Sequence, residues 1–337
     1  IAMQWLKRIA IGLVSLIVLL ALIGLLLPSK TQVERSIVIE RPLSLVHPLL
    51  NSFKRFNEWS PWFAADPNAE YTYSGGDSGV GAKMAWKGNE SVGQGSQTIT
   101  ASEPERIAVD LDFGEMGIAK AEYRLAAEGK GTRVTWAFET DAGYDLLNRW
   151  FGLLMDRFIG ADYERGLAQL QKLALTLPDV DIAGADIAIV ERAAQPILYV
   201  TASSTTDPAA IAQAYGNAYG LIGAQMGKAG LEQSGAPMGI DNYYDERGYS
   251  FDAAIPVART DVELEAPVQA GTSYAGRAVR VRHTGPYTGL NAAEAQGKAF
   301  IAVHGLKSKD RTLTEFVSDP GNTPEAELIS DIYLPIE

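Results

Sequence analysis

Residues 311–317 read Arg-Thr-Leu-Thr-Glu-Phe-Val and alternate polar and apolar side chains with the two-residue period of a β-strand. This period places Leu313, Glu315 and Val317 on one face of the strand. A carboxylate that is buried without a partner costs several kcal/mol, so Glu315 in an apolar row requires a cation or a hydrogen-bond donor. A solvent-facing or edge strand is the alternative that this pattern leaves open.

Aromatic residues flank this strand in the sequence. Tyr287 follows a Gly-Pro pair upstream, and Tyr333 lies in the apolar stretch 329–336 downstream. Aromatic rings around an inward-facing acid form a pocket suited to a cation. We therefore expect Glu315, Tyr287 and Tyr333 to line a ligand-binding pocket, with Tyr244 as a further contributor. Exchanging Glu315 for Gln is expected to weaken cation binding without destabilising the empty domain, because it removes a buried charge.

The last third of the chain repeats one order of elements, which is strand, helix, strand and strand. Both repeats end on a similar motif, Ile-Pro-Val at 255–257 and Leu-Pro-Ile at 334–336. Such a duplication predicts a pseudo-twofold pair with a ligand cleft between its halves. The expected elements are strand 187–200, helix 209–229, and strands 238–244 and 250–257, then strand 273–283, helix 287–304, and strands 311–318 and 327–336.

Residues 186–337 resemble the gyrase-inhibitor-like (GyrI-like) effector-binding domain. The resemblance implies that Glu315 faces an aromatic pocket that contacts cationic ligands, and that some relatives use this acid to hydrolyse reactive small molecules. No helix-turn-helix precedes the domain, so a transcription factor is a poor analogy for the chain. The motifs that carry the resemblance are Tyr-Tyr-Asp at 243–245, Ile-Pro-Val at 255–257, His-Thr-Gly-Pro-Tyr at 283–287, Thr-Glu-Phe-Val-Ser-Asp-Pro at 314–320 and Ile-Tyr-Leu-Pro-Ile at 332–336.

The middle third predicts one strand, two short helices, six strands separated by glycine-rich turns, and a long closing helix. The long helix, from Tyr144 to about Leu175, has an apolar side that consists of Leu147, Phe151, Leu154, Phe158, Leu167 and Leu170. The other expected elements are strand 33–39, helices 43–51 and 52–58, and strands 71–73, 80–86, 94–102, 107–113, 119–125 and 132–138.

This order of elements is that of the helix-grip fold, in which a curved sheet wraps the last helix and leaves an apolar cavity. Residues 31–177 resemble the START-like polyketide cyclase/dehydrase (SRPBCC) superfamily, whose members mostly bind lipids or small apolar ligands. Trp86, Trp136 and Trp150 are candidates for the cavity wall, and a simple core position is the alternative for each. The resemblance rests on Glu-Trp-Ser-Pro-Trp at 58–62, Gly-Val-Gly-Ala at 79–82, Gly-Thr-Arg-Val-Thr-Trp at 131–136 and Gly-Ala-Asp-Tyr-Glu-Arg-Gly-Leu at 160–167.

The N-terminal region contains an apolar run from Ile9 to Leu27, which is long enough to cross a hydrocarbon core. Lys7 and Arg8 precede this run and place the N-terminus in the cytoplasm. A cleaved signal peptide is the alternative, but the end of the run lacks the small-residue pattern that cleavage prefers. We therefore expect a single-pass protein of the inner (cytoplasmic) membrane with its globular domains outside the cytoplasm.

Composition limits the chemistry. The formal net charge of −12 argues against a nucleic-acid partner, because binding phosphates requires basic groups. The chain has no cysteine, and its three histidines, His47, His283 and His304, lack metal-ligand spacing. We therefore expect no thiolate catalysis, no protein-bound metal and no cofactor.

The sequence thus predicts an α+β chain with an anchor at 1–29, a START-like domain at 30–178, a linker at 179–185 and a GyrI-like domain at 186–337. Three functions are compatible with these features. The first is a membrane-anchored protein that binds an apolar ligand in one domain and a cationic or amphipathic ligand in the other. The second is a hydrolase in which Glu315 is the general base and Tyr287 or Tyr333 a donor. The third is a ligand-gated protein of envelope stress or partner binding.

Overall fold

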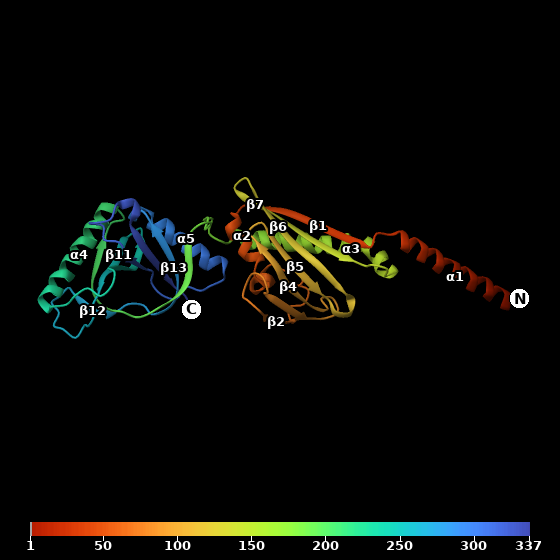
Figure 1. Cartoon of the computed structure of the whole chain (residues 1–337), viewed down its shortest axis with the longest axis horizontal. Coiled ribbons are helices and arrows are strands. Elements are labelled where there is room, and N and C mark those ends of the chain that lie inside the picture. The colour runs from red at the N-terminus through yellow and green to blue at the C-terminus, as the bar shows by residue number, and fades with distance from the viewer. Residues whose placement is uncertain (1) are drawn as a thin grey trace. The chain divides into compact units, whose positions relative to one another are not determined.

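The computed structural model describes residues 2–337, which divide into two compact units, Ile1–Asp179 and Val180–Glu337. Each unit contains its own antiparallel sheet and its own helices, as Figure 1 shows. The chain is therefore of the α+β class, as the sequence predicts.

The first unit contains a seven-stranded sheet in the order β1-β7-β6-β5-β4-β3-β2. The six strands from β2 to β7 form a meander, and β1 pairs with β7 to complete the sheet. Its elements are α1 (Ala2–Leu26), β1 (Lys30–Ile39), α2 (Leu43–Leu50), η1 (Phe53–Glu58), β2 (Glu70–Ser74), β3 (Lys83–Lys87), β4 (Gln94–Glu103), β5 (Arg106–Asp112), η2 (Gly114–Met116), β6 (Ile118–Glu128), β7 (Gly131–Asp141) and α3 (Leu146–Leu175).

One helix of this unit differs in type from the sequence prediction, and one strand begins later than expected. The second short helix, η1, is a 3-10 helix. The strand expected from Val80 begins only at Lys83, because Gly79 and Gly81 have positive φ angles of 74° and 89° and turn the chain before the strand. Val80 lies exposed in this turn.

The core of the first unit is aromatic. Trp136 of β7 and Tyr163 of α3 stack with ring centroids 3.7 Å apart and planes inclined by 10°. Trp59 packs edge-on against Trp136, and all three side chains are buried. A Cβ at Gly166 would lie 2.8 Å from the Trp136 ring, so the absence of a side chain there allows α3 to approach the sheet.

The apolar side that the sequence predicts for α3 is divided between the core and the surface. Leu167 and Leu170 are buried, whereas four residues of the first half of the helix are between 48% and 66% exposed. The first half meets β1 through glycines instead: a Cβ at Gly152 would lie 2.5 Å from Thr31, and one at Gly160 2.2 Å from Arg35. The exposed residues, which we call the α3 stripe, are Leu147, Phe151, Leu154 and Phe158.

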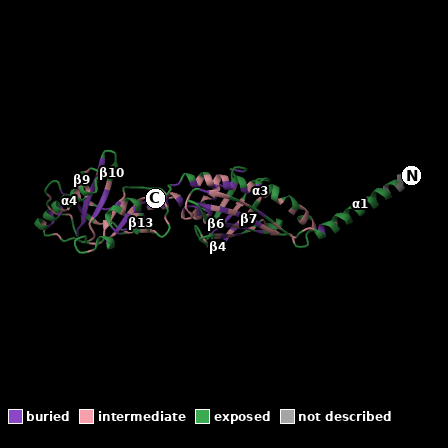
Figure 2. Ribbon diagram, turned by 90° about the horizontal axis from the view of Figure 1, so that it is seen from above, coloured by how far each residue is buried: buried purple, intermediate pink, exposed green. Residues whose placement is uncertain are grey.

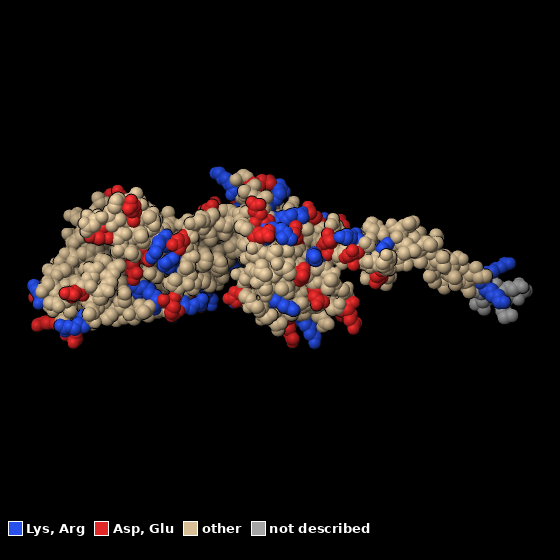
Figure 3. Space-filling model, viewed as in Figure 1, with Lys and Arg blue, Asp and Glu red and all other residues tan. Residues whose placement is uncertain are grey.

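Helix α1 is exposed along most of its length (Figure 2). Its segment Lys7–Leu26 is long and apolar enough to cross a membrane, and a signal sequence would share these properties. In Figure 3 the visible face of α1 carries Lys and Arg near its N-terminal end and no acidic or basic residue along the segment that follows. This distribution is compatible with lipid around the helix.

The second unit contains an eight-stranded sheet in the order β12-β9-β11-β10-β14-β15-β13-β8. The repeats β9-α4-β10-β11 and β13-α5-β14-β15 meet where β10 pairs with β14. The elements are β8 (Asp186–Arg192), β9 (Pro196–Ser204), α4 (Pro208–Ala229), β10 (Met238–Asp245), β11 (Gly248–Pro256), β12 (Gln269–Thr272), β13 (Gly276–Thr284), η3 (Tyr287–Gly289), α5 (Leu290–Val303), β14 (Leu313–Phe316), η4 (Glu325–Glu327) and β15 (Ile329–Pro335).

The stretch expected to be one strand at 187–200 is two strands, β8 and β9. β8 pairs with β13 of the second repeat at one edge of the sheet, whereas β9 pairs with β11 of the first repeat. Residues 193–195 separate the two strands, and Pro196 is the first residue of β9, where the missing N–H is tolerated and the residue before it is restricted. The strand expected at 273–283 is β13, which begins only at Gly276, and the separate short strand β12 precedes it.

Both helices of this unit lie on the same face of the sheet. The register aligns Ala253, Gly239, Thr314, Ile332 and Val281 across the five strands from β11 to β13. Ala253 belongs to the core under α4, and Ile332 and Val281 belong to the core under α5. The next row, including Met238, Glu315 and Asp331, therefore faces the other side, which we call the open face.

Candidate functional site

A cavity of about 260 Å³ lies between the sheet of the first unit and α3. Its wall contains seven aromatic side chains, four aliphatic side chains and four polar side chains. The volume is slightly below the roughly 300–1,000 Å³ of sites for drug-sized ligands, so the cavity suits a small apolar molecule. The lining residues are Phe56, Trp62, Tyr71, Trp86, Phe113, Phe138, Tyr163, Met84, Val92, Leu111, Ile159, Asn57, Ser60, Gln97 and Asp162.

The three tryptophans proposed for the cavity wall have three different positions. Trp86 lines the cavity, Trp136 lies in the core beneath Tyr163, and Trp150 donates a hydrogen bond of 3.3 Å from Nε1 to the Leu20 carbonyl of α1. Trp62, which the sequence placed only in a family motif, is a further wall residue. Its Nε1 donates to Asp162 at 3.0 Å, so this carboxylate has a partner within the chain.

Two amides of the cavity wall have weak hydrogen bonding. Asn57 Oδ1 is buried and has no hydrogen-bond partner among residues 2–337. Gln97 is also buried, and its Nε2 has the Met84 sulfur as a partner at 4.0 Å. Leaving a buried amide unsatisfied costs about 1–3 kcal/mol, so a ligand with a polar group would satisfy it. The sequence carried a signal for this residue, since Gln97 and the buried Ile99 share one face of the β4 strand.

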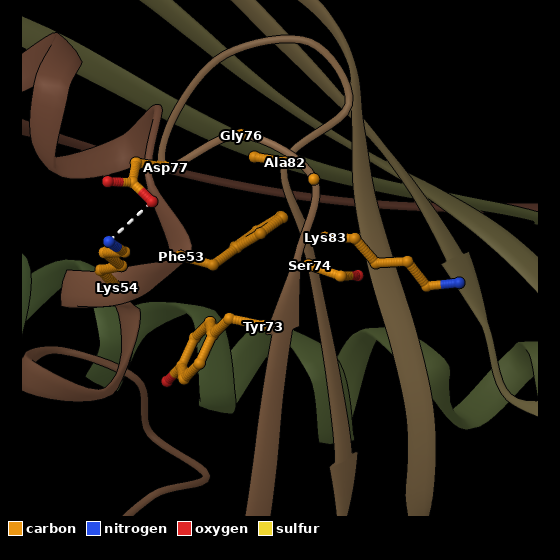
Figure 4. Close-up of a pocket in the computed structure, with 9 residues that line it drawn as sticks. Phe53, Lys54, Tyr73, Ser74, Gly76, Asp77, Ala82 and Lys83 are labelled. Atoms are coloured by element: carbon orange, nitrogen blue, oxygen red, sulfur yellow. Dashed lines mark ion pairs between the residues drawn. The ribbon is translucent and has the colours of Figure 1, made fainter.

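A second, shallower pocket of about 250 Å³ lies beside the loop between β2 and β3. Figure 4 shows Lys54 and Asp77 directed toward one another, and their Nζ and Oδ1 atoms are 2.6 Å apart. Gly75 is required in this loop, because a Cβ would lie 2.0 Å from the Gly81 carbonyl oxygen. Lys54 is therefore held by an ion pair with a loop residue, and Lys83 is the other basic residue of the pocket.

In the second unit, Glu315 forms an ion pair with Arg192 of β8 on the open face. The Arg192 side chain is only 7% exposed and also donates to the Ser273 hydroxyl and the Tyr274 carbonyl, each at 2.9 Å. Glu315 is thus inward-facing, and its cation comes from within the chain. The sequence analysis missed Arg192, although it is the single basic residue of its strand.

The structure brings Tyr333 to Glu315 but places the other two predicted aromatics elsewhere. The Arg192 guanidinium lies 5.1 Å from the centre of the Tyr333 ring, and burial, with the Glu315 carboxylate nearby, raises the pKa of Tyr333 to about 12. Tyr287 packs against Phe316, which follows Glu315 and therefore points to the helix side of the sheet. Val317 is exposed instead of continuing the apolar row, because β14 ends at Phe316.

Tyr244 belongs to an aromatic cluster on the helix side. It packs against Tyr249, whose hydroxyl donates to Asp241 at 2.6 Å and lies 3.0 Å from the Tyr215 hydroxyl. Because Tyr249 donates to the carboxylate, Tyr215 donates to Tyr249. Burial raises the pKa of Asp241 to about 6, with Glu294 adding to this effect. The sequence analysis did not single out Asp241, although it is an acid within the expected strand 238–244.

The structure brings together only part of the residue set expected for a hydrolase. One oxygen of the Glu315 carboxylate, Oε1, accepts a hydrogen bond from the Arg192 guanidinium. Tyr287, one of the two proposed proton donors, lies on the opposite side of the sheet. Among the described residues that line the cavity of the first unit, Ser60 is a hydroxyl group, and no histidine lies with it as a base.

Comparisons with known proteins describe the two parts of the chain separately. Residues 30–174 match the family described as polyketide cyclase/dehydrase and lipid transport. No curated protein matches the chain.

Several solved structures are similar in fold. The EcmrR C-terminal domain is 19% identical in sequence, with a TM-score of 0.41. The match covers 46% of this chain and 98% of that chain. A hydrolase from Listeria innocua is 15% identical, with a TM-score of 0.34 and coverages of 45% and 91%. The protein Ms6760 from Mycobacterium smegmatis is 17% identical, with a TM-score of 0.33 and coverages of 43% and 92%.

We expect Glu315→Gln to destabilise the second unit, because it leaves the Arg192 guanidinium buried without its counter-ion. Removing one partner of a buried ion pair costs about 3–5 kcal/mol, which reverses the expectation drawn from the sequence. Met238 is fully buried and pairs with Glu315 across the ladder, so its oxidation by peroxide in a urea series reports unfolding of this unit. Asp261→Asn removes an exposed ion pair with Arg259 and should cost about 1 kcal/mol or less. An unchanged midpoint for Glu315→Gln would show that the carboxylate is available to an external cation.

We expect the Asp241 carboxyl to make the second unit less stable as the pH rises. Its pKa is about 6 in the folded chain and 3.8 for the free group. The stability that the protonated group contributes to the folded state is therefore full below pH 3.8 and is lost as the pH rises past 6. Relative to Asp241→Asn, which keeps an acceptor for Tyr249, the natural chain should lose about 2–3 kcal/mol between about pH 4 and pH 7. Urea midpoints from Met238 oxidation measure this difference. Because Arg247 lowers the pKa of Asp245, the natural chain should gain stability relative to Asp245→Asn as the pH rises. The same dependence of stability on pH for both variants would contradict the assignment to Asp241.

Proposed function

We propose that the chain is a membrane-anchored small-molecule-binding protein whose first unit holds an apolar ligand with one polar group. The observation that carries this proposal is the cavity between the sheet and α3, with its aromatic wall and the weakly bonded amide of Gln97. The match of residues 30–174 to a family described as including lipid transport supports it.

The finer fold assignment belongs to the same proposal. A seven-stranded sheet with β1 beside β7 and a long helix across it supports a helix-grip fold of the START-like kind for residues 30–178. Two copies of strand, helix, strand and strand, joined through β10 and β14, support a GyrI-like domain at 186–337. The linker at 179–185 follows from these two assignments.

For the second unit we propose a binding role in which a cationic or amphipathic ligand competes with Arg192 for Glu315. Tyr333 would contact such a ligand on the open face, whereas Tyr287 and Tyr244 lie on the helix side of the sheet and would not contact it. The hydrolase hypothesis loses support, because the carboxylate it requires as a base is held by Arg192. A role in envelope stress or partner binding has no specific observation in its favour.

For location we propose that α1 is an uncleaved anchor in the inner (cytoplasmic) membrane with the N-terminus inside. Its apolar segment is 20 residues long, which matches a hydrocarbon core of about 30 Å at 1.5 Å per residue. Lys7 and Arg8 lie at the N-terminal end of this segment and favour that end in the cytoplasm.

Filling the cavity should weaken binding of an apolar probe. Ile159→Trp places a larger side chain in the cavity wall. The fluorescence of N-phenyl-1-naphthylamine with residues 30–337 should then show that the probe binds at least about tenfold more weakly, a loss of roughly 1.4 kcal/mol. The matched control is Leu153→Trp on the exposed side of the same helix. Gln97→Leu should weaken 1-naphthol binding more than naphthalene binding, since only the hydroxyl uses the amide. Unchanged affinity for Ile159→Trp, with folding verified by circular dichroism, would place the ligand elsewhere.

The orientation of α1 can be tested by reporter fusions after Glu337. An alkaline phosphatase fusion should be active, because Lys7 and Arg8 retain the N-terminus in the cytoplasm. A fusion to green fluorescent protein exported by the same route should remain dark. The reverse pattern would place both units in the cytoplasm. Release of the chain from the membrane with a shortened N-terminus would identify a cleaved signal sequence.

A further inference from the structure

The α3 stripe is an apolar surface without a protein partner in the first unit. Leu147, Phe151, Leu154 and Phe158 follow the spacing i, i+4, i+7 and i+11, so they lie within about 60° of one another around the helix. All four are exposed, and the glycines that meet β1 lie on the opposite side of the helix. The next positions on this line are Ala161 and Arg165, so the row of large apolar side chains ends after about 17 Å.

The first turns of α3 are attached to the apolar helix α1. Gly24 faces Trp150 and Leu146, and the Trp150 Nε1 donates to the Leu20 carbonyl at 3.3 Å. Leu20 precedes the last residue of α1, Leu26, by about 9 Å along the helix axis. If the Lys7–Leu26 segment spans about 30 Å of hydrocarbon, Trp150 lies beside a part of α1 that lipid surrounds.

Arg149 fixes the same junction through the end of α1. Its Nη1 donates to the carbonyls of Leu25 and Leu27 at 2.9 and 3.1 Å, and its Nε donates to Gly143 at 2.8 Å. A guanidinium at a helix C-terminus satisfies carbonyls that lack partners within the helix. The start of α3 is therefore held at the level where α1 leaves the apolar layer.

A second exposed apolar group lies at the same end of the sheet. Met116 and Ile118, at the turn between β5 and β6, are both largely exposed. The Ile118 carbonyl accepts a hydrogen bond from Thr140, which lies at the end of β7 opposite the start of β1, and β1 begins four residues after α1 ends. The turn therefore lies at the end of the sheet where α1 joins it.

The cavity extends to this end as well. Phe113, three residues before Met116, and Ile159, directly after Phe158, both line the cavity. Phe113 and Ile159 are half-exposed, as are Trp86 and Val92 of the same wall. The apolar surfaces and the accessible part of the cavity wall are thus neighbours.

We propose that the α3 stripe and the β5–β6 turn lie in the surface of the lipid bilayer and hold the mouth of the cavity against it. The occupant is lipid because the stripe is continuous with the junction to α1, which rests on the proposed anchor function of α1. An amphipathic helix at a bilayer surface buries its apolar face at the boundary of headgroups and acyl chains. An apolar ligand then passes between bilayer and cavity without crossing water.

The test uses the full chain in phosphatidylcholine vesicles, because the absence of native cysteine allows single labelled positions. An environment-sensitive nitrobenzoxadiazole label is attached to Phe158→Cys in the stripe, Ile118→Cys in the turn, Leu16→Cys within α1 and Leu175→Cys at the far end of α3. Quenching by lipids with brominated or spin-labelled acyl chains is then measured. We expect strong quenching at positions 16, 118 and 158 and none at 175.

The outcomes separate this inference from the anchor. Quenching at position 16 without quenching at 118 and 158 overturns the bilayer-facing surface and retains the anchor. No quenching at position 16 means that the anchor itself is absent, which overturns both. A blue-shifted emission at 158 without lipid quenching shows that a protein surface, such as a second copy of the chain, covers the stripe.

Discussion

The stacked rings of Trp136 and Tyr163 determine how the first unit is arranged. They hold α3 against the sheet at one point, and Gly166 allows the close approach. Because Tyr163 also forms part of the cavity wall, the contact that fixes the helix defines one side of the binding space. The adjacent first half of the helix is left free to present its apolar stripe outward.

The second unit depends on a comparable constraint at its centre. β10 and β14 join the two repeats, and β14 is only four residues long. Adjacent residues of β14 point to opposite sides of the sheet. Glu315 pairs with Arg192 on the open face. Phe316 packs against Tyr215 and Tyr287 on the helix side. A single strand thus contributes to two distinct clusters, one ionic and one aromatic.

Local pattern was sufficient for much of the architecture. Alternating residues in 311–317 and the glycine-rich turns of the middle third report backbone preferences that act over a few residues. The repeated order of elements placed most strands and helices of the second unit. The predicted boundaries were wrong at two places. Two glycines with positive φ delay the start of β3, and the chain leaves the sheet between β8 and Pro196, where β9 begins. The inward orientation of Glu315 followed from periodicity, but its partner did not, since Arg192 lies 123 residues away in sequence.

The sequence by itself determined the α+β class, the apolar N-terminal segment, the inward position of Glu315 and the amphipathic side of α3, because each depends on spacing along a short segment. Only the tertiary structure decided which cation meets Glu315, which aromatics share its face, that Gln97 lines a cavity, and that the first half of the α3 apolar side is exposed. These depend on which distant segments become neighbours. Side-chain periodicity gives the direction in which a residue points along its own helix or strand, but it does not identify what lies opposite.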